Sequence, residues 1–362
     1  MADRLRVALV GGPMYDSLYE PFIDDVDVVL HADHPTLNRR VAELLAAGER
    51  IDVLSTHGKY APSQAAWLRP LDDLLDPLVV DELAERAVDL CRFHGSLLCA
   101  PRNIDVRTLW WRTDRMDAAP DTWAELTASD AVFGFTGRES GLFGLFFELV
   151  AGNGGALFDA DGHPTMTGPE AEAAVALLCE LATRAPDELP DWHYDDVDRA
   201  LLDGRVDCAA AWPGGYGPVR DSDLYVHLAP ARYFAGTAAR VSYSGVHGWA
   251  IPTTCGDLDG AVELVTRLCS ADMHHREAAA GGIPARTDVL ATIEPVDATD
   301  EARLTITRDT IEKGMITYPS LVRFPEVEDA GWGAIHDALR GELSPSAAVA
   351  SIQYAAESVL SA

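Results

Sequence analysis

The N-terminal segment alternates short apolar runs with a helical pattern. The runs at 7–10, 26–30 and 51–54 are too short to form helices and are bounded by polar or glycine residues. Over 35–48 the apolar residues instead recur at helical spacing, and Gly48 stands where a helix C-terminal cap is expected. Strand–helix–strand repetition with short connections predicts a parallel sheet that is covered by helices on both faces.

The length and charge of the chain narrow its architecture and its partners. A chain of 362 residues is long enough for two domains at roughly 100–200 residues each. Its 28 basic and 58 acidic residues give a formal net charge of −30. Such an excess of carboxylates repels phosphate backbones and anionic lipid surfaces, so we expect no nucleic-acid partner and no membrane-surface binding.

Two features bear on the compartment of the protein. The most apolar stretch, 142–150, is half as long as a membrane-spanning helix and carries Glu148, which indicates a core helix. The N-terminus shows no apolar signal region before its first strand, so either a leader was trimmed off or the protein stays inside the cell.

The six cysteines include no Cys-x-x-Cys pair, and we expect buried, reduced thiols. Cys91 and Cys99 flank a predicted hairpin turn at His94-Gly95. They are therefore the one pair with local geometry suited to a disulfide, a question that the spacing leaves open.

Loops at the carboxyl ends of parallel strands are the usual ligand sites of such sheets. Here these loops are 11–15 and 55–60. They nominate Tyr15, His57 and Lys59 as ligand contacts.

Catalytic and metal-binding motifs are absent from the sequence. It has no nucleophile elbow, phosphate-binding loop or zinc-binding His-Glu-x-x-His helix. Asp159, Asp161 and Glu170 match part of a calcium-loop spacing, but Pro164 stands where that loop needs glycine. We therefore expect no catalytic residue, no metal and no cofactor.

Two glycine-rich turns carry aromatic residues, at 212–217 and 243–249. Glycine lets backbone amides approach a ligand closely, and indole or phenol rings offer a flat apolar face with a polar tip. A sugar ring presents a matching patch of C–H groups surrounded by hydroxyls. These turns therefore favour a carbohydrate ligand.

The order of several motifs resembles that of the extracellular solute-binding proteins (family 1) of ABC importers, the carbohydrate-uptake class. The matching segments, in chain order, are 48–54 (GERIDVL with its Asp-Val strand), 70–74 (PLDDL), 98–111, 121–126 (DTWAEL), 152–169 (GNGGALFDADGHPTMTGP), 248–251 (GWAI) and 281–289 (GGIPARTDV).

The resemblance implies an α/β, two-lobed periplasmic-binding-protein type II fold. Each lobe would be a mainly parallel sheet flanked by helices, and a multi-strand hinge would join the two. Lobe one would hold 1–106 and 251–310, and lobe two would hold 107–250 and 311–362, with the ligand in the cleft between them.

The resemblance also implies a function without chemistry. A sugar, oligosaccharide or polyol would be bound by hinge closure and delivered to the permease subunits of an ABC transporter by a monomer, outside the cell, at its surface or in the periplasm. The ligand-binding positions that it implies are Tyr15, His57, Lys59, Asn103, Asp105, Glu139, Ser140, Trp212, Tyr216, His247, Trp249 and Arg286.

Three alternatives stay open at this point. His57, Lys59, Arg138 and Arg286 would suit a phosphorylated or acidic sugar. A two-lobed enzyme acting on a carbohydrate would need a poised nucleophile or carboxylate, and the sequence nominates none. A cytoplasmic sugar sensor would fit a chain that never had a leader.

Overall fold

Three parallel strands and one antiparallel strand form the centre of the first sheet. In the computed structural model, which describes residues 4–12 and 15–361, the order is β2-β1-β3-β12-β6. Strands β1 (Leu5–Val10), β2 (Val26–Ala32) and β3 (Val53–His57) are parallel, and β12 (His247–Ala250) runs antiparallel to β3. The strands predicted at 7–10, 26–30 and 51–54 are therefore confirmed, the last one displaced by two residues.

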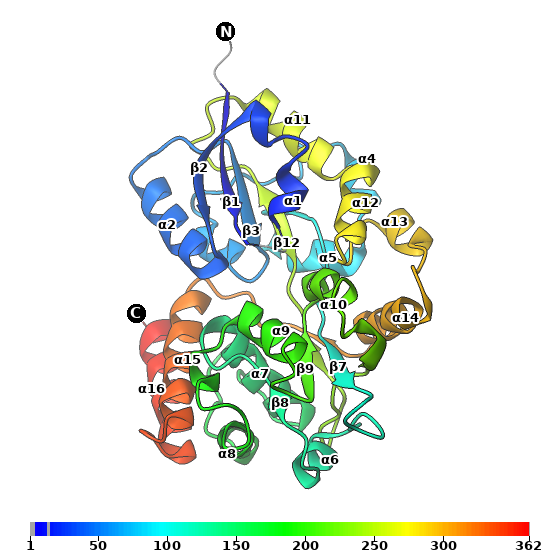
Figure 1. The fold of residues 1–362 in the computed structure, drawn as a ribbon. Helices are drawn as coiled ribbons and strands as arrows, with labels where there is room; N and C mark the ends of the chain where they lie inside the picture. The colour runs from blue at the N-terminus through cyan, green and yellow to red at the C-terminus, as the bar shows by residue number, and fades with distance from the viewer. Residues whose placement is uncertain (1–3, 13–14, 362) are drawn as a thin grey trace. The chain divides into compact units, whose positions relative to one another are not determined.

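Helices lie on both sides of this sheet (Figure 1). Helix α2 (His34–Ala46) packs against β1 and β2, and α11 (Leu258–Leu268) packs against β3 and β12. Gly48 ends α2 with a φ of 76°, the left-handed conformation predicted for this cap. The remaining elements here are α1 (Asp16–Tyr19), α3 (Ala61–Gln64), α4 (Pro77–Asp81), α5 (Glu85–Leu90), β4 (Arg92–Phe93), β5 (Ser96–Leu97), β6 (Ala100–Pro101), α12 (Ala271–Ala279) and α13 (Thr287–Thr292).

The second sheet has the order β10-β7-β9-β8. Its strands are β7 (Thr108–Arg112), β8 (Phe133–Gly134), β9 (Cys208–Ala211) and β10 (Leu228–Ala231). Only β8 and β9 are parallel, whereas β7 is antiparallel to both β9 and β10. The expectation of a mainly parallel second sheet is therefore wrong in this detail. A parallel neighbour needs a long crossover, and β7 instead enters the sheet directly from the extended segment that precedes it.

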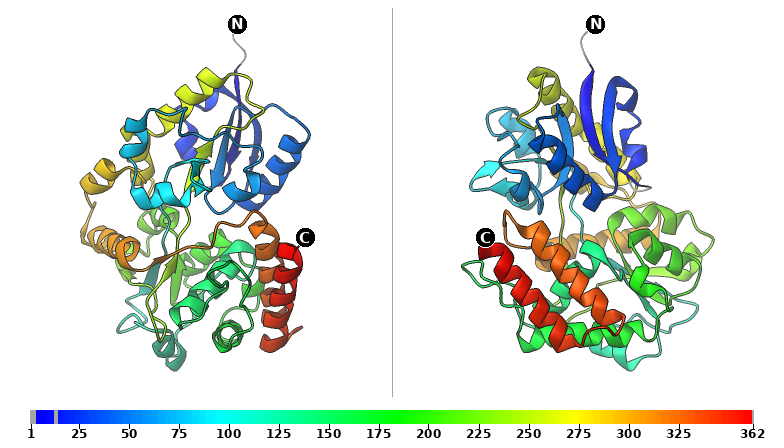
Figure 2. Two further views of the ribbon diagram at one scale, coloured as in Figure 1. Left: turned by 180° about the vertical axis from the view of Figure 1, so that it is seen from behind. Right: turned by 90° about the vertical axis from the view of Figure 1, so that its left-hand side faces the viewer.

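Helices surround this second sheet. Helix α7 (Glu139–Gly152) is buried along nearly its whole length, as expected for the apolar stretch at 142–150, and α8 (Pro169–Ala182) packs on it. Figure 2 shows α15 (Phe324–Leu339) and α16 (Pro345–Ser361) side by side. The other elements are α6 (Trp123–Ala128), α9 (Tyr194–Leu202), α10 (Tyr216–Arg220), β11 (Ser242–Tyr243), α14 (Ala298–Lys313) and β13 (Met315–Ile316).

The chain divides into two compact units, each assembled from separate segments. Unit 1 holds Met1–Asp105, Gly245–Ile293 and Ser320–Phe324, and unit 2 holds Val106–Ser244, Glu294–Pro319 and Pro325–Ala362. These boundaries differ from the sequence expectation at four places: Val106, 245–250, 294–310 and 320–324. Residues 245–250 belong to unit 1 because β12 pairs with β3, and 294–310 belong to unit 2 because α14 packs on β7 and β10.

All six cysteines are free thiols, so Cys91 and Cys99 are not joined to each other. Among the described residues, no helix combines the length and the apolar character that crossing a bilayer requires.

A buried ion pair lies in the core of unit 2. The Arg107 guanidinium Nε is 3.3 Å from Oε1 of Glu148, and the two side chains are 2% and 1% exposed. The same carboxylate oxygen accepts the backbone N–H of Tyr243 at 2.8 Å. Burial raises the pKa of Glu148, while the Arg107 charge opposes that rise. The pair holds α7 against the segment that leads into β7.

We expect Glu148→Gln to destabilise the protein by about 3–5 kcal/mol, because it leaves the Arg107 charge buried without a counter-charge. Urea unfolding followed by circular dichroism would measure the loss. The matched control is Glu180→Gln on α8, whose ion pair with Arg184 is exposed and should cost about 0–1 kcal/mol. Equal losses in the two variants would contradict the role given to the buried pair.

Candidate functional site

A cluster of three histidines lies at one edge of the unit 1 sheet. His57 ends β3 and is the register partner of His247, which begins the antiparallel strand β12, so the two side chains share one face. His34 opens α2 just beyond the carboxyl end of β2. The three ring centroids are 4.9–5.2 Å apart. We call His34, His57 and His247 the histidine cluster.

Polar side chains extend the histidine cluster. The Tyr15 hydroxyl lies 3.2 Å from Nε2 of His247, and Oδ2 of Asp105 lies 3.3 Å from the same nitrogen. Asn103 donates to Oδ1 of Asp105 at 3.1 Å and accepts the backbone N–H of His247 at 3.0 Å. Five of the predicted site residues, Tyr15, His57, Asn103, Asp105 and His247, are thus brought together in unit 1.

Burial controls the protonation of this group. His57 and His247 are about 5–6% exposed, and burial lowers the pKa of both imidazoles, with the Lys59 charge acting in the same direction. Burial raises the pKa of Asp105 to about 7, against the influence of Arg102 and the Asn103 hydrogen bond. Near neutral pH the imidazoles are therefore neutral, and Asp105 is close to its midpoint.

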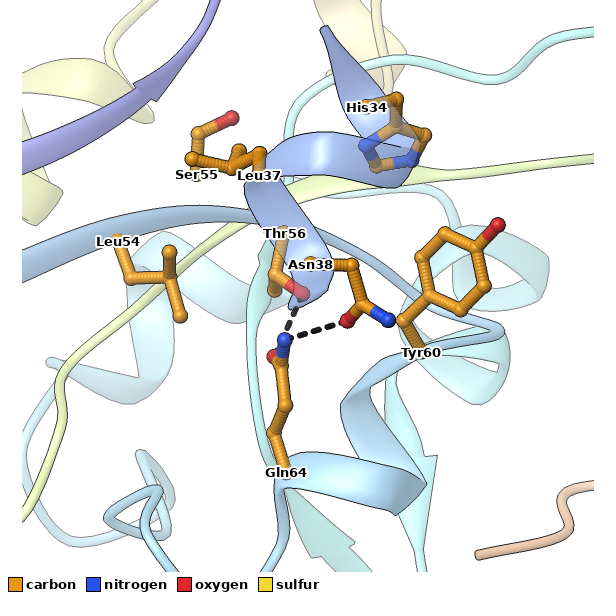
Figure 3. Close-up of a pocket in the computed structure, with 8 residues that line it drawn as sticks. All are labelled: His34, Leu37, Asn38, Leu54, Ser55, Thr56, Tyr60 and Gln64. Carbon is orange, nitrogen blue, oxygen red and sulfur yellow. Dashed lines mark hydrogen bonds between the residues drawn. The ribbon is translucent and has the colours of Figure 1, made fainter. Parts of the chain in front are cut away.

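A small pocket adjoins the histidine cluster, and the polar side chains that line it hydrogen-bond to one another (Figure 3). It holds about 160 Å³ of empty space between α2, β3 and the segment 60–64, in gaps too narrow for a water molecule. Gln64 donates to Asn38 at 2.7 Å and accepts from the Thr56 hydroxyl at 2.9 Å. This pocket is therefore packing behind His34 and offers no room for a solute.

Unit 2 carries a second polar and aromatic surface, again at the carboxyl ends of parallel strands. Trp212 follows β9, and Ser140 lies in the first turn of α7, which follows β8. The Ser140 hydroxyl is 2.8 Å from the hydroxyl of Tyr194, and the Tyr194 ring meets the Trp212 ring edge-on at 6.4 Å. We call Glu139, Ser140, Tyr194 and Trp212 the Trp212 surface.

The Trp212 indole is half-buried, and a cation lies over one of its faces. The Arg107 guanidinium carbon is 4.8 Å from the centre of the indole ring, within the range of a cation–π contact. Glu139 lies beside this group with Oε2 2.8 Å from Nε2 of His193. Its φ of 56° is costly for a residue other than glycine, and such strain concentrates at functional sites.

Three predicted site residues, Trp249, Tyr216 and Arg286, pack against or pair with residues of their own unit. Trp249 is 2% exposed and packs against Tyr19 and Phe22, because it lies two residues further into β12 than His247 does. The structure therefore argues against Trp249 as a stacking face for a ligand. Tyr216 is likewise buried, stacked on Trp110 with the Arg303 guanidinium over its ring.

Arg286 is the third of these residues. Its guanidinium lies 2.5 Å from a carboxylate oxygen of Glu82 and 2.8 Å from one of Asp288, and it donates to the Cys269 carbonyl at 3.3 Å. Arg286 is thereby used to join α13 to its neighbours. Lys59 lies next to the histidine cluster, with its ammonium 4.7 Å from the centre of the Tyr60 ring.

The sequence-based prediction missed His34, His193, Tyr194 and Arg107, and a sequence signal exists only for His34. His34 follows the second apolar run just as Tyr15 follows the first and His57 ends the third, so the strand-end rule also nominates it. Tyr194 and His193 lie in a segment with no local motif, and Arg107 lies in the matched segment 98–111 without having been nominated as a site residue. Only the fold brings these residues to Trp212 and its neighbours.

Comparison with known proteins places this architecture. The family model described as "Bacterial extracellular solute-binding protein" matches residues 25–303. Because this match spans most of the chain, the chain belongs to the bacterial extracellular solute-binding protein family. The two-lobed α/β fold expected from the sequence motifs is confirmed by solved structures that are similar over nearly the whole chain.

Three of these structures illustrate the likeness. Maltose-bound MalE3 of T. maritima has 21% identity and a TM-score of 0.88, covering 98% of this chain and 99% of that one. An ABC transporter solute-binding protein of Agrobacterium radiobacter K84 in complex with ribitol has 18% identity and a TM-score of 0.85, covering 99% and 98%. The GacH receptor of Streptomyces glaucescens, solved unliganded and with acarbose, has 17% identity and a TM-score of 0.86, covering 100% and 99%.

The shifted pKa values predict opposite pH effects for two substitutions. Below pH 6.5 the histidines of the unfolded chain become protonated, whereas buried His57 stays neutral in the native state. Lowering the pH therefore reduces the free energy of unfolding by up to about 1.4 kcal/mol per pH unit for this group. Asp105 has the opposite effect. Between pH 3.8 and about pH 7 the native state binds the proton of this carboxyl more tightly than the unfolded chain does, so its contribution to the free energy of unfolding is lost as the pH rises.

Between pH 6.5 and 5 we therefore expect His57→Gln to lose less stability than the wild type, and Asp105→Asn to lose more. Melting temperature against pH would measure both slopes. His275→Gln, at an exposed position on α12, is the control and should follow the wild-type slope. Wild-type slopes in both test variants would show that neither group has the shifted pKa described here.

Proposed function

We propose that this protein is the substrate-binding component of an ABC importer and binds a sugar, oligosaccharide or polyol. Membership of the extracellular solute-binding family supports the general role. The ligands named in the three similar structures described above are maltose, ribitol and acarbose, which all carry many hydroxyl groups. Its site of action would be the periplasm or the outer cell surface, where it would deliver solute as a monomer to the permease subunits.

The half-buried indole of Trp212 is the observation that carries the proposal for the solute. One of its faces is next to the Arg107 guanidinium, and the hydroxyls of Ser140 and Tyr194 lie beside it. An indole face suits the C–H patch of a sugar ring, while neighbouring hydroxyls both donate and accept hydrogen bonds to its rim. In unit 1, Tyr15, Asn103 and Asp105 offer the same mixture of polar groups around the histidine cluster.

The charges around these residues favour a neutral solute over a phosphorylated or acidic one. Arg107 pairs with Glu148, and Arg102 pairs with Glu277 at 2.9 Å. Arg286 is paired with two carboxylates. Cations already paired with carboxylates contribute little to binding an anion, so hydrogen bonding and stacking would supply the affinity.

We expect Trp212→Ala to weaken solute binding by about 2 kcal/mol or more, roughly thirtyfold in Kd, as removal of a stacking anchor does. Calorimetry with a panel of maltose, ribitol, acarbose and a sugar phosphate would identify the solute and measure the loss. Trp212→Phe keeps an aromatic face and should retain most of the affinity.

Trp111→Ala on β7 is the matched control, since this half-buried tryptophan lies outside the Trp212 surface. An unchanged Kd in Trp212→Ala would remove the indole from the solute site. Tighter binding of the sugar phosphate than of every neutral member would favour the acidic-sugar alternative instead.

The mechanism that we propose is closure without chemistry. A solute that binds residues of both units binds best when both sets are within its reach, so it shifts the population toward that arrangement. We expect the radius of gyration from small-angle scattering to fall when solute is added, and the recovered solute to be unchanged on chromatography. Chemical conversion of the solute would favour an enzyme, and an unchanged radius at saturating solute would exclude closure.

A further inference from the structure

The histidine cluster has the composition and spacing of a transition-metal site. One ring nitrogen from each of His34, His57 and His247 lies within 4.8 Å of the other two. We propose that these three imidazoles bind a divalent late-transition-metal ion, Zn²⁺ in the first instance. Zn–N bonds of about 2.0–2.1 Å place tetrahedral ligand atoms about 3.4 Å apart, so small ring movements would close the site.

Unpaired buried nitrogens are the second observation that points to a ligand. Within the described residues, both ring nitrogens of His34 and Nδ1 of His247 are buried and have no hydrogen-bond partner. A buried polar atom without a partner costs about 1–3 kcal/mol, and three such atoms on two adjacent rings call for an explanation. A metal ion that accepts one lone pair from each of the two rings would account for two of these three nitrogens, and the other nitrogen of His34 would carry the proton of that ring.

The protonation state of the cluster suits ligation. Burial lowers the pKa of all three imidazoles, and the positive charges of Lys59 and Arg102 act in the same direction on His34 and His247. The neutral ring is the form that ligates a metal, so no proton has to be displaced first. The same two cations would oppose a bound dication, and they set a limit on its affinity.

Asp105 orients one of the rings. Its carboxylate lies 3.3 Å from Nε2 of His247, and a proton on that nitrogen leaves the Nδ1 lone pair for the metal. A carboxylate behind a histidine is the usual support of a ligating imidazole. His57 differs, because its Nδ1 accepts the Lys59 backbone N–H at 3.1 Å. Ligation by His57 therefore requires release of that amide hydrogen bond, and ligation through Nε2 would also require the proton to move to Nδ1.

The donor set selects the type of ion. Three neutral nitrogens favour Zn²⁺, Cu²⁺ or Ni²⁺, whereas Mg²⁺ and Ca²⁺ require mostly oxygen ligands. Three protein ligands also leave one position of a tetrahedral zinc ion for water. Among the residues that the structure describes, the other cluster of donors is an exposed group in unit 2, formed by Asp159, Asp161 and His163. Its Asp159 already accepts two backbone N–H groups, so it serves here as a control.

The test uses untagged full-length protein treated with a chelator, with Zn²⁺ alone as the probe and no sugar present. We expect calorimetry to give one equivalent of Zn²⁺ that excess Mg²⁺ does not displace. His34→Gln, on a half-buried ring in the first turn of α2, should weaken binding by about tenfold or more, as should His247→Gln. Bound Co²⁺ should give the intense visible absorption of a tetrahedral site, lost in His34→Gln.

The controls are His163→Gln and His275→Gln, which should bind Zn²⁺ as the wild type does. Absence of Zn²⁺ binding, or wild-type binding by a folded His34→Gln variant, would overturn the proposal. Loss of the Zn²⁺ site in His163→Gln would assign it to the exposed group instead and overturn the proposal equally. Because sugar is absent, these outcomes are independent of whether the protein binds a carbohydrate.

Discussion

The pairing of β12 with β3 is the interaction on which the organisation of unit 1 depends. It joins His247 to His57, and between these two residues the chain passes through most of unit 2. Closing so long a loop has an entropic cost that rises only slowly with length, and the ladder to β3 and β6 together with buried Ile251 and Val265 offsets it. The same pairing sets the imidazoles of His57 and His247 edge to face, with ring centroids 5.0 Å apart. Asn103 and Asp105 lie within hydrogen-bonding distance of His247 and of each other.

Unit 2 is organised around a buried charge. Arg107 precedes β7, pairs with Glu148 of α7 and lies over the Trp212 ring that follows β9. One guanidinium thus links the core of the unit to its exposed aromatic surface. The position of the indole is therefore set by the ion pair behind it, and a change at Glu148 would reach Trp212 through Arg107.

Local signals in the sequence account for several element ends. Gly48 ends α2 in the left-handed conformation, Thr122 caps α6 by accepting the Glu125 backbone N–H at 3.1 Å, and Pro169 begins α8. These features depend on neighbouring residues alone. The antiparallel entry of β7 and the exchange of 245–250 and 294–310 between units depend on pairing between distant segments, which local patterns do not contain.

The residues of the candidate site likewise fall into those that the sequence nominated and those that only the tertiary structure brings together. Strand-end position nominated Tyr15 and His57, the glycine-rich turn at 212–217 drew attention to Trp212, and the family resemblance added Asn103, Asp105 and Ser140. All of these residues lie in the histidine cluster, among its polar neighbours or in the Trp212 surface. The motif containing Trp249 was matched correctly, but burial in the core removed its ring from use. Tyr194 and Arg107 come from separate segments, and their proximity to Trp212 is a property of the tertiary structure alone.

The discontinuity of unit 1 has a consequence for its biosynthesis. Strand β3 leaves the ribosome about 190 residues before its partner β12 does, which at 5–20 residues per second is on the order of ten to forty seconds. During that interval one edge of β3 has no strand to pair with, and an unpaired edge is a template for wrong association. Until β12 is synthesised, the nascent chain must therefore avoid wrong pairing at this edge. It can do so if non-native collapse is slow, or if a chaperone covers the edge.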